Sequence, residues 1–452
     1  MARRAAAWRL CAVTQHGEPI VQDDPAAGGH PRRLMTQWTR ATIYTRAAAV
    51  MAAVLGLAAC GTISRVPISA EQVSASPYTR DLDRYRFPSG DEGPFLAWLG
   101  RWAGERRARG MDGVKGLALS GGGANGAYGA GVLVGWSERG DRPRFDIVTG
   151  VSTGALAAPM AFVGPAWDGH LAEAYQNDRL KALTADRLAV LRNPSLYGSG
   201  PLTRLVDRYV TADLLKAIAV EHAAGRRLVV ATTNLDTRSA MIWDLGAIAT
   251  DAGDAERRDA ATALFKRVLV AAASIPGIFP PVIISADPEG VIGEMHVDGG
   301  VIAPFFLVPE TLNFWRPEAL MRPTDLYLII NGQTGSAFSM TGGASVAIVE
   351  RTLDTLGRAD ARNQIRFVSA FASRNGAAVA VAAIPDALEA NPLKFDADYT
   401  KRLFALGRDR AFAGQAFAEP GVLEWLRDDP GWQGRSPAHE PQPNRGTGDA
   451  NR

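Results

Sequence analysis

A serine flanked by glycines stands at residues 150–154, where the sequence reads Gly-Val-Ser-Thr-Gly. An apolar run at 145–149 precedes it, and the small residues at 155–158 favour a following helix. Strand, sharp turn and helix would place Ser152 at the apex of the turn, because the glycines allow a tight backbone that exposes its hydroxyl. The stretch therefore predicts a nucleophilic serine.

Such a serine needs a base and a site for developing negative charge, because its hydroxyl is a poor nucleophile at neutral pH. A glycine run, Gly121, Gly122 and Gly123, follows the strand-like residues 114–119 and leads into a helix through about residue 138. Main-chain N–H groups at a helix N-terminus point outward with a favourable dipole. We expect these three glycines to form an oxyanion hole, with the amides of Gly122 and Gly123 as donors.

The same run has an alternative interpretation as a dinucleotide-binding loop. Gly121, Gly123 and Gly126 satisfy the pattern G-x-G-x-x-G between a strand and a helix. That motif requires an acidic residue about 20 positions on, at the end of the next strand. Asp146 has this spacing but begins its strand, which ends in the serine turn. A dinucleotide-binding oxidoreductase is therefore the less favoured alternative.

The base is predicted by elimination and position. A Ser-His-Asp triad in α/β-hydrolase order needs a histidine late in the domain, and none of the six histidines has that place. They are His16, His30, His170, His222, His296 and His439. Asp298, before Gly299 and Gly300, ends a strand, and parallel strands would bring this end to the edge that carries the serine.

Desolvation beside Ser152 should raise the pKa of Asp298 above its ordinary 3.9 and make it a usable base. The alternative interpretation of Asp298 is a turn residue. His296 lies on the same strand face, two residues earlier. It either packs in the strand, which we favour, or influences or replaces the aspartate.

The blocks at 121–126, 150–154 and 298–300 together resemble those of patatin-like phospholipases. Residues 273–281 resemble a fourth, structural block, so the resemblance covers roughly residues 113–335. It implies an acyl-ester hydrolase with Ser152 as nucleophile, Asp298 as base and no metal or cofactor. The substrate would be a phospholipid or another acyl ester.

Two residues depart from what the resemblance and helix propensity lead one to expect. The family's glycine block usually has arginine or lysine where this chain has Asn125, which cannot supply a charge to order the loop or attract a phosphate. Pro159 falls inside the helix after the serine, where it would remove a backbone hydrogen bond. We expect a kink or a short first helical segment there.

The order of elements predicts an α/β fold, a three-layer sandwich with a mostly parallel central sheet. Strands are expected near 114–119, 145–149, 227–232, 240–243, 282–284, 296–298, 325–331 and 377–384. Helices are expected near 256–272, 344–372 and 398–417, and residues 165–225 look mostly helical, as a lid or a wall. An aromatic stripe at 95–102 predicts a short amphipathic helix, which packs on the domain or touches lipid.

The N-terminal part has the pattern of a lipoprotein signal. Arg40 and Arg46 precede an apolar run at 47–59 that ends Leu-Ala-Ala before Cys60. This resembles a bacterial lipobox and implies diacylglycerol on Cys60, the alternative being an ordinary signal with a chance cysteine. Gly61, rather than aspartate, then favours the outer membrane, facing the periplasm.

Domain boundaries follow from these patterns. We expect 1–34 to precede a native start at Met35, 35–59 to be the signal peptide, 60–112 a tether and lead-in helix, 113–425 the hydrolase domain and 426–452 a disordered tail.

Composition limits the function further. Hydrophobic residues make up 47% of the 452 and charged ones 21%, as in globular proteins, and the net charge of +2 argues against a nucleic-acid partner. Two cysteines exclude a disulfide framework. The favoured function is a membrane-anchored serine acyl hydrolase. A non-catalytic lipid-binding envelope lipoprotein is the other alternative.

Overall fold

The computed structural model describes residues 63, 65–176, 195, 198–285, 287, 290–307, 322–335, 338, 340–343, 345–388 and 390–418. All of them belong to one folding unit, Cys60–Arg452. The expectations for residues 1–34, for the signal peptide and Cys60, and for the tail from 426 lie outside the described residues.

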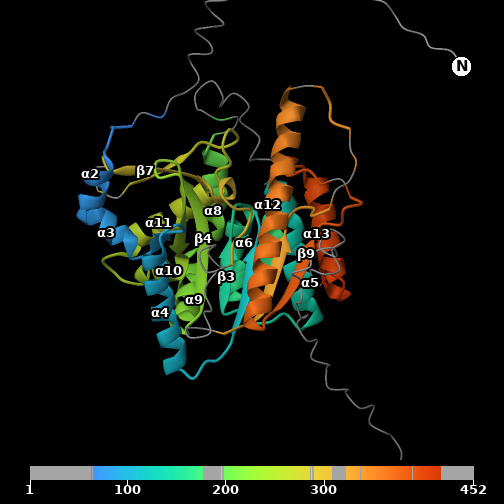
Figure 1. Ribbon diagram of the computed structural model, residues 1–452, viewed down its shortest axis with the longest axis horizontal. Coiled ribbons are helices and arrows are strands. Elements are labelled where there is room, and N and C mark those ends of the chain that lie inside the picture. The colour runs from blue at the N-terminus through green and yellow to red at the C-terminus, as the bar shows by residue number, and fades with distance from the viewer. Residues whose placement is uncertain are drawn as a thin grey trace, which may run out of the picture. The chain divides into compact units, whose positions relative to one another are not determined.

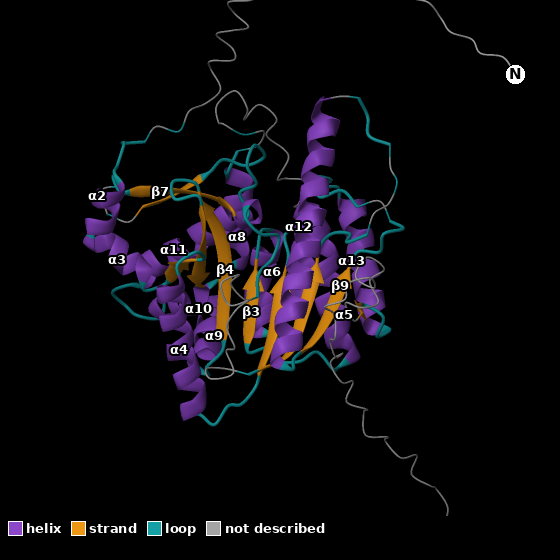
Figure 2. Cartoon of the chain, in the orientation of Figure 1, coloured by secondary structure: helices purple, strands orange, loops and turns teal. Residues whose placement is uncertain are grey.

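One sheet runs through the molecule, and its centre is parallel in the order β4-β3-β2-β8-β9 (Figures 1 and 2). Antiparallel strands extend it: β5 and then β1 beside β4, and β10 beside β9. The strands are β1 (Arg86–Pro88), β2 (Val114–Leu119), β3 (Ile147–Gly150), β4 (Arg227–Asn234), β5 (Ser239–Asp244), β6 (Val282–Ser285), β7 (Gly293–Asp298), β8 (Pro323–Ile330), β9 (Ala378–Ala383) and β10 (Phe417–Ala418). The predicted fold class, an α/β sandwich with a mostly parallel sheet, is confirmed.

Helices cover both faces of the sheet, because alternate side chains of its strands point to opposite sides. Along β2, Val114 and Ala118 face α4 (Glu92–Ala108) and α12 (Ser345–Asn375), whereas Leu117 and Leu119 face the opposite layer. That layer contains α5 (Gly126–Arg139), α6 (Thr153–Val163), α7 (Asp168–Gln176), α8 (Gly200–Tyr209), α9 (Ala212–Ala223), α10 (Leu245–Asp251), α11 (Arg258–Ala272) and α13 (Ala397–Phe412).

Helices α5 and α13 lie backbone to backbone. A Cβ atom on Gly131 would stand 2.1 Å from the carbonyl oxygen of Phe404, and one on Gly135 would stand 2.0 Å from that of Arg408. Only glycine permits this approach. The contact fixes α13, from the C-terminal part of the chain, beside the helix that follows the glycine run.

The segment before residue 113 belongs partly to the fold, which differs from the expected tether. Helices α2 (Ala70–Ala75) and α3 (Pro77–Asp83) precede β1, which pairs with β5 at the edge of the sheet. The aromatic stripe of α4 packs inward, with Phe95 and Trp102 buried, so the expectation of packing rather than lipid contact is confirmed. The indole of Trp102 also donates to the carbonyl oxygen of Gly225 (2.8 Å).

Most predicted elements are present with shifts of a few residues. The helix expected to reach 417 instead ends at Phe412, and Phe417–Ala418 forms β10. In the predicted helical region, α8 forms a wall of the pocket described below, and residues 177–194, 196 and 197 lie outside the described part.

Candidate active site

Ser152 occupies a strained turn between β3 and α6. Its φ of 55° and ψ of −127° lie outside the regions that residues with a side chain ordinarily adopt. A Cβ on Gly154 would stand 2.3 Å from the carbonyl oxygen of Leu119, so the start of α6 can lie against β2 only with glycine there. The strand, sharp turn and helix predicted from residues 150–154 are confirmed.

Asp298 reaches the serine by a different route from the expected one. Its strand, β7, is antiparallel, not parallel: Thr232 of β4 pairs with Asp298, and Asn234 pairs with His296. Strand β3 pairs with β4 only up to Gly150, which lies opposite Val230. Beyond that point β4 pairs with β7 instead. The last residue of β7, Asp298, therefore lies beside Ser152.

Burial dominates the electrostatics of Asp298. The side chain is enclosed, and desolvation raises its pKa to about 7, although the Ser152 hydroxyl and the N–H of Gly300 lower it in part. That N–H donates to Oδ1 at 2.8 Å. Oδ2 is buried and has no partner at hydrogen-bond geometry among the described residues, so the contact with Ser152 is looser than a formed hydrogen bond. Catalytic hydrogen bonds are often long until substrate binds.

The glycine loop offers amide donors beside Ser152. A Cβ on Gly121 would stand 3.1 Å from the Cβ of Ser152, so the loop touches the serine. The N–H groups of Gly122, Gly123 and Thr153 have no acceptor within the described part of the chain. The N–H of Gly121 donates to the carbonyl oxygen of Pro304 (2.8 Å), so of the three predicted glycines Gly122 and Gly123 are the ones whose amides can act as donors.

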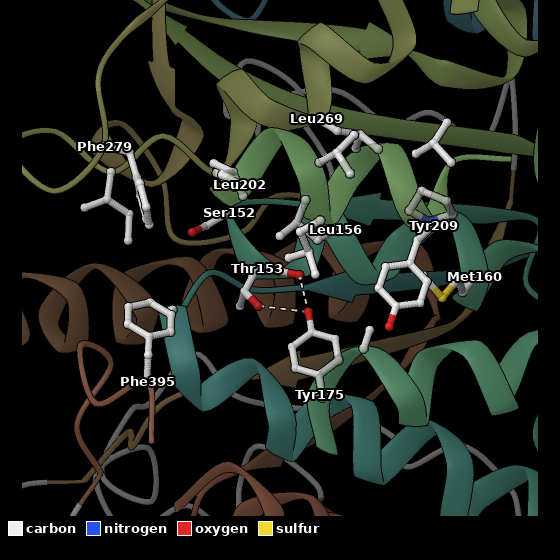
Figure 3. A pocket seen from close by; sticks show the side chains of 18 of the residues that line it. Ser152, Thr153, Leu156, Met160, Tyr175, Leu202, Tyr209, Leu269, Phe279 and Phe395 are labelled. Atoms are coloured by element: carbon white, nitrogen blue, oxygen red, sulfur yellow. Dashed lines mark hydrogen bonds between the residues drawn. The ribbon is translucent and has the colours of Figure 1, made fainter. Parts of the chain in front are cut away.

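An apolar pocket opens at Ser152 and follows α6 away from it (Figure 3). Its empty space is about 780 Å³, part of it open to solvent. Helices α6 and α8 supply the largest shares of the wall, and Met160 and Tyr209 lie at the end far from Ser152. The apolar lining includes Leu156, Pro159, Met160, Leu202, Leu205, Val206, Val210, Leu214, Leu269, Ile275, Phe279 and Phe395. Such a cavity suits a hydrocarbon chain.

The short first helical segment expected before Pro159 is absent. Helix α6 runs continuously from Thr153 to Val163, with the proline inside it and against the pocket. The hydrogen bond that proline cannot donate would have gone to the carbonyl of Ala155. Apolar packing along most of this buried helix offsets the loss.

His296 packs in the strand, as the favoured interpretation had it. One ring nitrogen, Nδ1, is 2.9 Å from Thr232 Oγ1, and Nε2 is 3.1 Å from Glu294 Oε2. Burial lowers the pKa of His296. Burial also opposes ionisation of Glu294, but hydrogen bonds from His296 and from Arg86 outweigh it and hold its pKa at about 2. Both imidazole nitrogens are thus occupied by residues other than Asp298.

The dinucleotide interpretation conflicts with the structure. Asp146 lies at the start of β3, where it accepts from the N–H of Lys115 (2.8 Å) and pairs with Arg106 (2.8 Å). This is the opposite end of the strand from the glycine loop, so it cannot hold a ribose bound there. Among the described residues, no group of three or more His, Cys, Asp or Glu side chains could hold a metal ion.

Residues beyond the predicted set also shape the site. Asn331 at the end of β8, Pro392 before α13 and Tyr399 within α13 hold the glycine loop. Phe395 lines the pocket. Only Asn331 carried a sequence signal, a polar residue ending a buried strand. No local sequence pattern indicates Pro392, Phe395 or Tyr399, because these residues lie more than 200 positions after the glycine loop.

Fold and site define an α/β protein with a serine elbow, a neighbouring buried carboxyl and an apolar pocket. Residues 117–309 match the family model described as patatin-like phospholipase, and the chain thus contains a patatin-like phospholipase domain. Membership of the domain in this family supports a lipid acyl hydrolase at the level of the family.

Comparison with individual proteins adds little. Among solved structures the chain is similar to VipD from Legionella pneumophila, at 14% identity over 68% of each chain with a TM-score of 0.32. No individual curated protein matches.

Proposed function

We propose that the protein hydrolyses acyl esters of lipids through a dyad of Ser152 and Asp298. The observation that carries the proposal is the enclosed carboxyl of Asp298 in contact with the Ser152 hydroxyl, with a pKa raised to about 7. A base is most effective when its pKa lies near the working pH. An ordinary aspartate would accept a proton too weakly.

The proposed reaction proceeds in two halves. Ser152 Oγ attacks the ester carbonyl carbon and passes its proton to Asp298, while the amides of Gly122 and Gly123 donate to the oxyanion. Asp298 returns the proton to the leaving alcohol, which leaves an acyl chain on Ser152. A water molecule then gives a proton to Asp298 and attacks the acyl carbon. The fatty acid departs and the proton returns to Ser152.

Covalent labelling tests this proposal against the alternative of a non-catalytic lipid-binding lipoprotein. An alkyl fluorophosphonate reacts only with an activated serine, so we expect it to modify Ser152, as located by mass spectrometry of the digested protein. Phospholipid vesicles incubated with the same protein should release free fatty acid. A chain that binds the vesicles but takes no label and releases nothing would establish the non-catalytic alternative.

The pocket supports a hydrocarbon acyl chain as the group that is transferred. Met160 follows Ser152 by eight residues on α6, so its place is roughly 12 Å along the helix axis. Leu156 lies halfway. An acyl chain lying along α6 would pass Leu156 before it meets Met160 and Tyr209.

Leu156→Trp is therefore expected to change chain-length preference. A bulky ring halfway along the pocket should lower kcat/KM for long-chain aryl esters by at least about 10-fold and spare acetyl and butyryl esters. A series of p-nitrophenyl esters measures this, with the volume-conserving Leu156→Met as control. Equal losses on short and long esters would show that the acyl chain lies elsewhere.

We further propose that a lipid on Cys60 holds the protein on the outer membrane, facing the periplasm. Its support is the lipobox-like sequence and the position of Arg65, which pairs with Asp236 (2.7 Å) and donates to the carbonyl oxygen of Gly293 (2.6 Å). Five residues span at most about 18 Å, so the lipid would lie within reach of β7 and the catalytic edge. No helix in the described part of the chain is long and apolar enough to cross a bilayer.

Cys60→Ser tests the anchor. The variant should move from the membrane fraction to the soluble fraction and lose incorporation of labelled palmitate, because it lacks the thiol that carries the lipid. Hydrolysis of a soluble ester should persist, since the pocket is built from residues 123 onward. A wild-type chain with a free Cys60 thiol in intact-mass spectra would contradict the proposal.

A further inference from the structure

The loop that bears the amide donors is held from outside the family-matched stretch. On one side, the N–H of Asn331 donates to Ser120 Oγ (2.7 Å) and its Nδ2 donates to the carbonyl oxygen of Ser120 (2.8 Å). On the other side, the N–H of Ala124 donates to the carbonyl oxygen of Pro392 (2.8 Å). The loop thus lies between the end of β8 and the segment before α13.

The backbone of these two segments packs closely on the two donor glycines. A Cβ on Gly122 would stand 2.1 Å from the carbonyl oxygen of Asn331, and one on Gly123 would stand 2.2 Å from that of Pro392. Both glycines also have positive φ angles, 154° and 54°. The orientation of their amides therefore depends on where Asn331 and Pro392 lie.

A third contact lies directly after the donors. The Tyr399 hydroxyl donates to Asn125 Oδ1 (2.5 Å) and accepts from the N–H of Asn391 (2.8 Å). Asn125 is 3% exposed and follows Gly123 by two residues in the short 3₁₀ helix η1 (Gly123–Asn125). The hydroxyl thus joins the glycine loop to the segment that contains Pro392.

The chemistry of this bridge fits the neutral residue at position 125. Its observed side-chain partner in the described structure is a hydroxyl, and no ion pair is formed there. A buried cation without a carboxylate partner would be costly. An amide oxygen accepting from a phenol satisfies both groups without charge.

We infer that Tyr399 is a positioning residue for the oxyanion hole. Its hydroxyl holds Asn125, and through Asn125 the amides of Gly122 and Gly123, by neutral hydrogen bonds. The inference rests on the proposed hydrolase function. Because oxyanion donors bind the charge that develops in the transition state, misplacing them affects kcat far more than ground-state binding.

The experiment compares Tyr399→Phe with Tyr327→Phe on a soluble aryl ester. Tyr327 packs between Trp136 and Phe145, away from the loop, and serves as the matched loss of a tyrosine hydroxyl. We expect Tyr399→Phe to lower kcat by about 10- to 100-fold with KM unchanged, and to slow fluorophosphonate labelling by a similar factor. Tyr327→Phe should change neither.

A double-mutant cycle separates positioning from general destabilisation. Asn125→Ala alone should reproduce the loss in kcat, and the double variant should be no slower than either single variant, because both remove the same bridge. Multiplicative losses, an unchanged kcat, or a loss shared by Tyr327→Phe would overturn the inference. If Tyr399→Phe does not fold, Asn125→Ala tests the inference by the same criterion, a lowered kcat with KM unchanged.

The two proposals fail in different ways. An active wild type, an inactive Ser152→Ala and a fully active Tyr399→Phe would remove the positioning role and leave the hydrolase. A wild type that neither takes the label nor hydrolyses esters would overturn both.

Discussion

Ser152→Ala is expected to lower kcat for ester hydrolysis by at least about 10⁴-fold. Alanine removes the only atom that can form the acyl bond, while the oxyanion donors and the pocket remain. The fold should be retained, because the positive φ at this position strains alanine and serine alike. Release of fatty acid from vesicles and hydrolysis of a short aryl ester both measure the loss.

Ser137→Ala is the appropriate comparison for this variant. Ser137 lies near the C-terminal end of α5, where its hydroxyl donates to the carbonyl oxygen of Leu133 (3.1 Å), away from the elbow. It should retain wild-type kcat. Full activity in Ser152→Ala would show that another group attacks the ester and would refute the dyad.

Asp298→Asn is expected to lower kcat by about 10³- to 10⁴-fold, because the amide cannot accept the serine proton. The shape and the hydrogen bond from Gly300 are preserved, since the asparagine side chain keeps an acceptor oxygen. His296→Ala should cost much less activity, because the imidazole contacts Thr232 and Glu294 and not the dyad. If His296→Ala were the slower variant, the base would be misassigned.

The same carboxyl predicts the pH profile. The base must be ionised, so kcat/KM of the wild type should rise with pH through about 7 and level off above it. The network around His296 should not produce this inflection, because burial lowers the pKa of His296 and Glu294 titrates near 2. A profile that is flat between pH 6 and 8 would contradict the raised pKa.

Stability should change with pH in the opposite direction to activity. The folded protein keeps the Asp298 proton up to about pH 7, whereas the unfolded chain releases it near 3.9. The unfolded state therefore binds fewer protons between these values, and the free energy of unfolding falls as pH rises, by up to about 4 kcal/mol. Urea titrations at pH 5 and pH 8 should show about 2 to 3 kcal/mol of this contribution in the wild type, because the remainder is lost below pH 5, and none of it in Asp298→Asn.

Local chemistry made the serine elbow predictable. The residues at 150–154 fold as the sequence suggests because a strand, two glycines and small helix formers within 14 residues leave few other arrangements. The apolar strands and the alternation of strands with helices likewise dictate the sandwich. The aromatic stripe of α4 had to be covered, and the sheet covers it.

Other features depend on contacts between segments far apart in the sequence, and the sequence did not indicate them. The N–H of Gly121 bonds to Pro304, and the lead-in segment joins the sheet through β1. Sequence periodicity cannot indicate either partner, because each contact joins segments that are far apart in the sequence. Pro159 remains within its helix because the surrounding layer holds α6 along its length.

The sequence by itself determined the nucleophile candidate, the glycine loop and a carboxyl at a strand end, because each depends on a few neighbouring residues. Only the tertiary structure decided how they meet. Strand β7 runs antiparallel to β4 and pairs with it beyond the point where β3 ends. This pairing places Asp298 against Ser152. The enclosure that raises the pKa of Asp298, the pocket along α6 and the Tyr399 bridge likewise arise from packing between segments far apart in the chain.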